Sequence, residues 1–215
     1  MNKDEYSRKL RGECMVLEEG LKKADLLSKV CSSKRKINPE TLEQVITLAI
    51  EIAREGREGR KIGTMFIISD SDEVLRRSRC LILDPLLGHQ ASNKHIDDPN
   101  MRETIKELAQ LDGAFIVSDD GVVISACRYI NASTDGIDLP LGLGSRHLAA
   151  ASITKQTNAV AVVVSESSIV RVFDDGEIIS EIIPELWMLR RYYSHIPKPY
   201  SERSEEDITV VSKED

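Results

Sequence analysis

The chain has 215 residues, of which 41% are hydrophobic and 30% are charged, so it can bury one sizeable core beneath an ordinary polar surface. Its formal net charge of −7 argues against broad contact with nucleic acid or anionic lipid, although a few converging arginines can still hold a small anionic ligand. No apolar run approaches the roughly 20 residues of a membrane helix, and the scattered cysteines fit free thiols in a reducing cytosol, so we expect a cytoplasmic protein without a membrane or nucleic-acid partner.

The chain begins with a charged segment whose apolar residues recur at helical spacing. Residues 3–36 carry a narrow apolar stripe from Leu10 to Val30, which predicts one or two helices that need a partner surface. The basic cluster at 33–36 indicates a linker. We therefore expect an N-terminal helical segment over 1–37, and our hypothesis is that its stripe sets the oligomeric state.

The main domain begins with a helix followed by a strand. Asn38 and Pro39 predict a helix start, because asparagine caps helices and proline fits the first helical turn. Apolar residues then recur at helical spacing as far as Ala53, and Gly56 ends the pattern. The short apolar run at 63–69 predicts a buried strand.

The rest of the domain alternates between helices and strand pairs. Turn-forming residues across 84–100 predict a long surface loop. The elements predicted after it are a helix at 101–111, strands at 114–118 and 122–130, a helix that begins near Ser145, strands at 159–165, 169–173 and 178–183, and a last helix at 185–195. This order predicts an α/β fold over 38–196, with a mixed central β-sheet flanked by helices on both faces. We expect the polar tail at 197–215 to be disordered.

The stretch GLGSRH at 142–147 is the first candidate for chemistry. Two glycines before a predicted helix let the backbone approach a ligand, and a helix start offers unpaired N–H groups with a partial positive charge. Arg146 adds a bidentate phosphate donor, His147 adds a donor whose charge changes near neutrality, and Ser145 either caps the helix or donates to a phosphate. The alternative is a capped helix with an exposed Arg146 and a His147 packed against the sheet. The Walker spacing and its lysine are missing, so this stretch is not a P-loop.

Two carboxylates are the other candidates. Asp112 lies where a helix passes into an apolar strand, and the small residues Gly113 and Ala114 after it leave room for a flat group, although an ordinary Asp-Gly turn is the alternative. Glu166 closes another apolar strand, where it either binds a metal or belongs to a hairpin turn. Together with the cationic helix start, these carboxylates form the set that phosphoryl or nucleotidyl transfer needs.

Three ordered motifs give the chain a family resemblance: LDGA at 111–114, GSRHLAA at 144–150 and VVVSE at 162–166. In this order and spacing they resemble the diadenylate cyclase (DAC) domain family, over about residues 40–190. The resemblance implies an enzyme that uses Mg²⁺ or Mn²⁺ to condense two ATP molecules into cyclic di-AMP and two pyrophosphates. It also implies a homo-oligomer in which two chains meet face to face, so that each 3′-hydroxyl attacks the α-phosphate of the other ATP.

The same resemblance implies the role of each candidate side chain. The catalytic residues would be Asp112, Arg146 and His147, and the metal ligands would be Asp112 and Glu166. The residues that bind the substrate would be Gly113, Ala114, Gly144, Ser145, Arg146 and His147.

Two positions depart from the family pattern. Ser145 stands where the family has threonine and keeps the hydroxyl, whereas Leu148 replaces the family's second arginine and removes a cation. Arg128 and Lys155 are the candidates to replace that cation. Two alternatives to an active cyclase therefore stay open: a non-catalytic module that binds ATP or a cyclic dinucleotide, and an interaction domain in which the arginine and histidine are structural.

Overall fold

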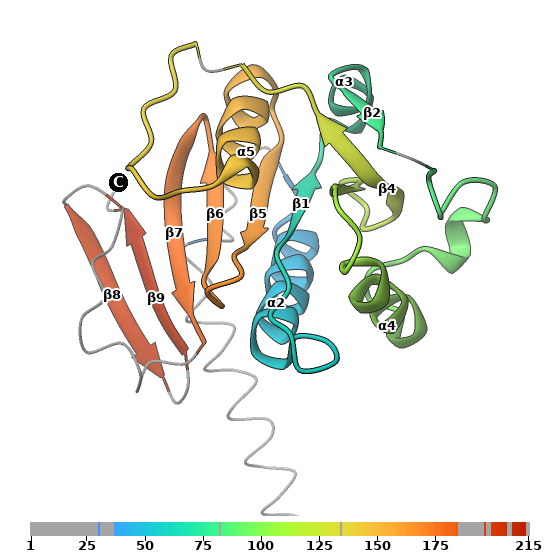
Figure 1. The fold of residues 1–215 in the computed structure, drawn as a ribbon, viewed down its shortest axis with the longest axis horizontal. Coiled ribbons are helices and arrows are strands. Elements are labelled where there is room, and N and C mark those ends of the chain that lie inside the picture. The colour runs from blue at the N-terminus through green and yellow to red at the C-terminus, as the bar shows by residue number, and fades with distance from the viewer. Residues whose placement is uncertain are drawn as a thin grey trace, which may run out of the picture.

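The structure of the chain is a computed structural model that describes residues 37–81, 83–133, 135–184, 199–205 and 208–213, together with Val30 and Ile196. The predicted helices within 3–36 and the predicted last helix at 185–195 lie outside the described residues. The described residues form one sheet with helices packed against it (Figure 1).

Within the described residues the sheet has nine strands, in the order β2-β4-β3-β1-β5-β6-β7-β9-β8 (Figure 1). β1 and β3 pair in parallel, whereas β5 pairs with the other side of β1 in the antiparallel direction, so the sheet is mixed. The strands are β1 (Thr64–Ile68), β2 (Ser78–Cys80), β3 (Ala114–Val117), β4 (Val123–Ile130), β5 (Val160–Val164), β6 (Val170–Asp174), β7 (Glu177–Ile183), β8 (Tyr200–Glu205) and β9 (Ile208–Lys213).

Helices cover both faces of this sheet. α2 (Pro39–Glu55) and α4 (Pro99–Leu108) pack on one face, and α3 (Ser71–Arg76) and α5 (Ser145–Gln156) pack on the other (Figure 1). A short 3₁₀ helix, η1 (Ala91–Asn93), interrupts the long loop before α4. The arrangement confirms the predicted α/β fold with a mixed central sheet flanked by helices on both faces.

The two helices on the α2 face begin at side-chain caps. Asn38 Oδ1 accepts a hydrogen bond from the Glu40 amide at 3.0 Å, as its position before Pro39 predicts. Asp98 caps α4 in the same way, through the amides of Asn100 and Met101. α4 therefore begins at its own proline and not at residue 101, where the sequence analysis placed the start.

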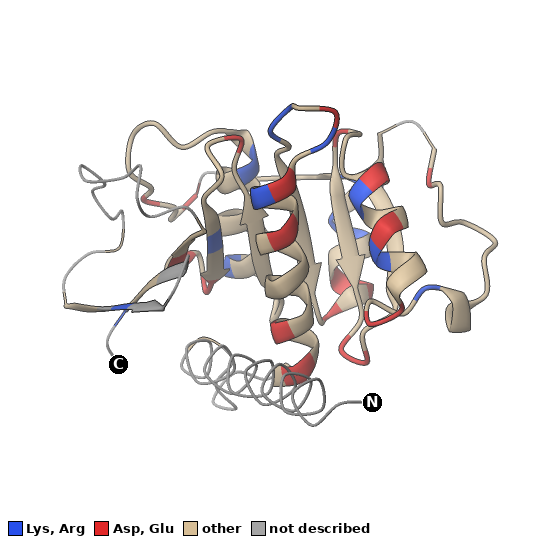
Figure 2. Ribbon diagram, turned by 90° about the horizontal axis from the view of Figure 1, so that it is seen from below, with Lys and Arg blue, Asp and Glu red and all other residues tan. Residues whose placement is uncertain are grey.

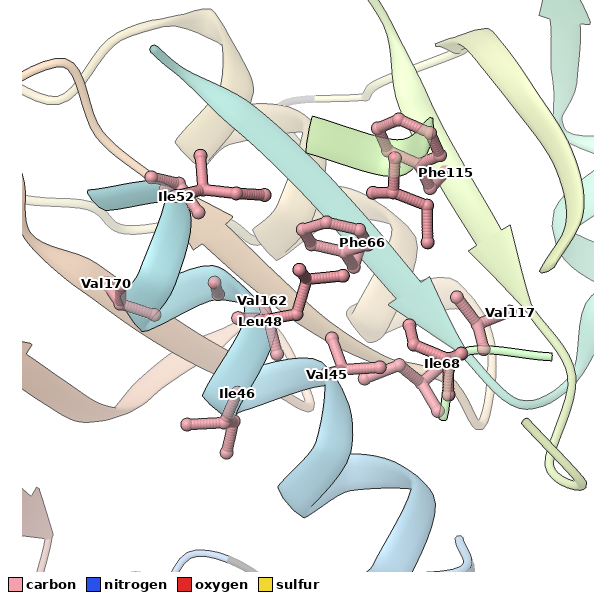
Figure 3. Close-up of a cluster of buried hydrophobic side chains, with 14 of the residues drawn as sticks. Val45, Ile46, Leu48, Ile52, Phe66, Ile68, Phe115, Val117, Val162 and Val170 are labelled. Atoms are coloured by element: carbon pink, nitrogen blue, oxygen red, sulfur yellow. The ribbon is translucent and has the colours of Figure 1, made fainter. Parts of the chain in front are cut away.

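The core forms on both faces because side chains alternate along the central strands. On β1, Phe66 and Ile68 face α2, whereas Met65 and Ile67 face α5. Figure 3 shows the cluster on the α2 side, where Phe66 stacks on Phe115 with ring centroids 5.1 Å apart. Each fully buried side chain of this size contributes about 1.5–3 kcal/mol, so the central strands are held firmly at both surfaces.

The C-terminal end of the chain differs from the prediction. The expectation of a disordered tail at 197–215 is wrong for β8 and β9, which pair with each other and extend the sheet beside β7. The physical reason lies in Val210 and Val211, which are both buried and reach the hydrophobic clusters on opposite faces of the sheet. A short apolar run is enough to form a strand when a neighbouring strand such as β7 is available to pair with it, even though the surrounding sequence is polar.

The surface of α2 and α4 is strongly charged. Figure 2 shows acidic residues along α2, and Glu51 of this helix pairs with Arg102 of α4 at 2.7 Å and with Lys106 at 3.2 Å. Lys106 also pairs with Glu55 and Glu103, and this cluster of carboxylates raises its pKa against the opposing effect of burial.

In the part of the chain that the structure describes, no helix is long and apolar enough to cross a membrane.

Candidate active site

One edge of the sheet brings the candidate carboxylates together. β1 and β3 run parallel and both begin at this edge, whereas β5 runs antiparallel and ends there, with Thr64 opposite Val164. Asp112 precedes β3 and Glu166 follows β5, so the strand directions place both at the same edge. The topology therefore explains how residues far apart in the sequence meet.

Arg146, in the first turn of α5, connects these two carboxylates. Its Nη2 donates to Asp112 Oδ1 at 3.1 Å, and its Nη1 donates to Glu166 Oε1 at 3.4 Å. The side chains of Asp112 and Glu166 are 86% and 70% exposed, whereas Arg146 is 32% exposed. Exposed ion pairs contribute only about 0–1 kcal/mol to stability, so this group, which we call the edge cluster (Asp112, Arg146 and Glu166), is not explained by a need to hold the fold together.

The start of α5 faces the same edge. Gly144 is the N-cap residue, and among the described residues no side chain caps this helix. Ser145 is the first helical residue and is exposed, so of the two roles considered for its hydroxyl the cap is wrong. The His147 amide already donates to the Gly144 carbonyl at 3.0 Å, so the amides of Ser145 and Arg146 and the Ser145 hydroxyl are the groups at this helix start that can bind an anion.

His147 lies apart from the edge cluster. Its side chain is buried, packs near the Phe173 ring, and places Nε2 3.1 Å from Arg171 Nη1. A guanidinium can only donate, so Nε2 accepts and carries no proton. The observed packing agrees with the alternative reading of a histidine held against the sheet, and its contact with phosphates stays a prediction.

A buried ion pair stands behind this histidine. Arg171 of β6 donates to Glu181 of β7 at 2.5 Å, and their side chains are 3% and 0% exposed. We call His147, Arg171 and Glu181 the buried network. It joins the first turn of α5 to two strands of the sheet.

Gly113 and Ala114 serve the packing at the start of β3. Gly113 has a φ of 115°, and an added Cβ would lie 2.6 Å from the carbonyl carbon of Cys127, so only glycine lets β3 and β4 approach this closely. Ala114 is fully buried in the cluster on the α5 face. Their predicted place beside a nucleoside stays a prediction.

The two candidates for the missing arginine make their contacts elsewhere. Arg128 donates to Ser78, to the Leu75 carbonyl and to Cys80, and so ties β4 to β2. Lys155 is in the last turn of α5 and pairs with Asp175 at 3.0 Å. It lines an open polar pocket of about 470 Å³ at that end of the helix. The contacts of Arg128 and Lys155 therefore do not reach the edge cluster.

Two features of this region were missed by the sequence analysis. They are the close approach of Gly63 to Arg146 and the ion pair of Arg171 with Glu181. Signals for both are present: a glycine directly before the buried strand TMFII, and charged residues within two otherwise apolar strands. Neither signal identifies its partner, because the partner depends on which strands and helices become neighbours.

A helix start, a guanidinium and two carboxylates gathered at one edge of an α/β sheet are groups that suit the phosphates of a nucleotide and a divalent cation. Residues 51–178 match the DAC family, described as DisA bacterial checkpoint controller nucleotide-binding. Because this match covers more than half of the chain, the chain belongs to the DAC family. The resemblance drawn from the three sequence motifs is confirmed.

Two curated relatives carry the name diadenylate cyclase. The protein from Methanocaldococcus jannaschii is 54% identical over 145 residues, which are 67% of this chain and 46% of the relative. The protein from Haloferax volcanii is 40% identical over 153 residues, which are 71% of this chain and 56% of the relative. The chain therefore spans about half the length of the curated relatives it matches.

Two solved structures are also similar to the chain, with low TM-scores. A hypothetical membrane-spanning protein from Bacillus cereus gives a TM-score of 0.49 at 18% identity. The match covers 65% of this chain and 62% of the chain of that protein. A double cysteine mutant of DacA from Staphylococcus aureus gives 0.43 at 20% identity and covers 65% of this chain and 84% of its own.

Proposed function

We propose that this chain is a diadenylate cyclase that condenses two ATP molecules into cyclic di-AMP and releases two pyrophosphates. The observation that carries the proposal is the edge cluster, in which two exposed carboxylates and a guanidinium from three separate segments come together. Membership of the DAC family and the names of two relatives support the same activity.

In this proposal Arg146 and the start of α5 bind the triphosphate. The guanidinium supplies bidentate donors, and the amides of Ser145 and Arg146 and the Ser145 hydroxyl lie at the same turn. To reach a phosphate, Arg146 exchanges a carboxylate for phosphate oxygens. This exchange costs little because the ion pairs with Asp112 and Glu166 are exposed.

Asp112 is the residue we assign to the attacking hydroxyl. It accepts the proton of an ATP 3′-hydroxyl as that oxygen forms a bond to the α-phosphorus of the other ATP. The bond from this phosphorus to the bridging oxygen breaks, and pyrophosphate leaves with the electron pair. A second such step closes the ring. A positioned base accelerates a step of this kind on the order of 10²–10⁴-fold.

Asp112 and Glu166 also suit a divalent cation, Mg²⁺ or Mn²⁺. Magnesium is usually held by one or two carboxylates together with substrate phosphates, and these two side chains are exposed at one edge. Among the described residues no group of three or more His, Cys, Asp or Glu side chains is arranged to hold a metal. A cation bound here would take its remaining ligands from phosphate oxygens and water, and would neutralise negative charge on the phosphates.

The stoichiometry of the reaction adds a requirement for two chains. Each chain offers one edge cluster, whereas the product contains two nucleotides, so one chain holds half of the reactants. A symmetric pairing of two chains through this edge would bring each 3′-hydroxyl to the other α-phosphate. The homo-oligomer is part of the proposal.

One observation favours a second function, a non-catalytic module that binds ATP or a cyclic dinucleotide. Leu148 stands in place of the family's second arginine, and both candidate replacements are committed to contacts elsewhere. A site with one arginine can hold a triphosphate yet stabilise the transition state less well.

Incubation of the purified chain with ATP and Mn²⁺, followed by mass spectrometry, separates these functions. The cyclase predicts cyclic di-AMP and pyrophosphate in a 1:2 ratio. A rise in melting temperature with ATP but no product would favour the binding module. Absence of both product and binding would contradict the proposal and leave the interaction domain.

A further inference from the structure

Gly63, the residue directly before β1, lies against the Arg146 guanidinium. A Cβ atom added to Gly63 would lie 2.8 Å from Arg146 Nη1, 3.3 Å from Arg146 Cζ and 3.1 Å from Glu166 Cγ. Real Cβ atoms essentially never approach another heavy atom within 3.0 Å. The observed position of the guanidinium therefore requires a residue without a side chain at this position.

The direction of the contact follows from the alternation along β1. Met65 and Ile67 face α5, and Gly63 continues the same series one step before the strand begins. The Gly63 hydrogen that occupies the position of a Cβ atom therefore points to the face of the sheet on which α5 and Arg146 lie. Gly63 is not among the glycines with positive φ, so the backbone conformation does not require glycine here, and the space occupied by Arg146 does.

We propose that Gly63 is a positioning residue for the reaction. Because Gly63 has no side chain, the Arg146 guanidinium can lie against the backbone at this position, between the two carboxylates. The proposal rests on the proposed function, because it concerns the arginine that we assign to phosphate binding. It adds a residue that lies outside the three family motifs and lies against Arg146 and Glu166.

The substitution Gly63→Ala separates this role from a role in folding. The atom that the new methyl group meets first is the end of a flexible side chain, so the arginine can move while the strand stays in place. We therefore expect an unfolding temperature no lower than that of the wild type. We expect cyclic di-AMP formation to fall by less than the roughly 10²-fold that a displacement of about 1 Å at a reacting centre causes, because the guanidinium has to move less than that to accommodate the methyl group.

A double-mutant cycle with Arg146→Ala tests whether Gly63 acts through the arginine. Without the guanidinium the closest contact of the methyl group is gone and the 3.1 Å approach to Glu166 Cγ remains, so Gly63→Ala in the Arg146→Ala background should cause a much smaller loss of ATP affinity than in the wild type. ATP affinity, measured by calorimetry with Mg²⁺, is the readout because it stays measurable when turnover is low. An equal loss of affinity in both backgrounds would overturn the proposal.

Crystal structures of the wild type and Gly63→Ala give a readout that needs no activity. The proposal predicts that the guanidinium leaves its place between Asp112 and Glu166 in the variant, and a guanidinium in the same place would overturn it. If the wild type makes no cyclic di-AMP, the proposed function fails while the crystal structures still decide the role of Gly63. If the wild type makes product and Gly63→Ala makes as much, only the inference about Gly63 fails.

Discussion

The edge cluster and the buried network each contain an arginine paired with acidic side chains or a histidine, and each includes a residue of the first turn of α5. The two groups differ in their exposure to solvent. The edge cluster joins Arg146 to two carboxylates that are largely exposed. The buried network joins Arg171 to Glu181 and His147, where the ion pair is almost completely excluded from water. Arg146 and His147 are neighbours in the chain, yet their side chains belong to different groups.

The difference shows which charges the protein can exchange for a ligand. Breaking an exposed pair costs little, so Arg146 and its carboxylates can exchange their partners for the phosphates and the metal of the proposed reaction. Removing one partner of a buried pair leaves an uncompensated charge and costs about 3–5 kcal/mol. We infer that the edge cluster serves chemistry and that the buried network fixes the turn that presents Arg146.

The largest effect should come from the edge cluster. Asp112→Asn keeps the size of the side chain but removes the proposed base, so we expect cyclic di-AMP formation to fall on the order of 10²–10⁴-fold. Product quantified by mass spectrometry gives the result, and thermal unfolding is the control, which should not change because Asp112 is exposed. Near-normal turnover would mean that Asp112 is not the base.

The second effect is on stability and comes from the buried network. Arg171→Met removes the guanidinium that donates to the buried Glu181 carboxylate, so the free energy of unfolding should fall by about 3–5 kcal/mol in urea denaturation. The double variant Arg171→Met, Glu181→Leu removes both charges and should recover most of this loss. A double variant as unstable as the single one would show that shape, and not charge, dominates at this place.

The buried hydroxyl of Thr64 offers a third test of how burial affects a polar group. Like the buried network it is polar, but among the described residues the Oγ1 atom has no hydrogen-bond partner, although the side chain is fully buried. Thr64→Val replaces the hydroxyl by a methyl group of similar size, so unfolding should require about 1 kcal/mol more free energy. A loss of stability in the same denaturation experiment would indicate that the hydroxyl is satisfied in solution.

The smallest effect on stability should come from Glu166→Gln. The pair that it breaks is exposed, so the free energy of unfolding should change by less than about 1 kcal/mol. Glu181→Gln is the matched control, because it makes the same change inside the buried network and should cost several times more. Equal costs at the two positions would remove the distinction between the two groups.

Much of the fold could be predicted from apolar periodicity. The strands at 64–68, 160–164 and 170–174 were predicted within one or two residues, because continuous runs such as TMFII and VAVVV leave little choice. The strands β8 and β9 were missed because their polar composition conceals a short apolar run that pairs with an existing edge. α3 and β2 were not predicted, since elements this short carry no clear period.

The site divides in the same way. Asp112, Arg146 and Glu166 were predicted from motifs, and the strand directions then explain why they meet. A His147 packed against the sheet was one of the two alternatives, whereas its contact with Arg171 and the contact of Gly63 with Arg146 could not be predicted, because each depends on a neighbour from another part of the chain. Sequence patterns identify which residues suit a chemistry, whereas the register of strands and helices decides which of them touch.

The proposed role of Arg146 is tested by comparing cyclic di-AMP formation by the wild type and by Arg146→Met, with the unfolding temperature of each measured in the same buffer. We expect the variant to lose most of its product formation while its unfolding temperature stays close to that of the wild type. A variant that keeps wild-type turnover would show that Arg146 does not serve the reaction, and a variant that loses activity only because it no longer folds would show that Arg146 serves the fold.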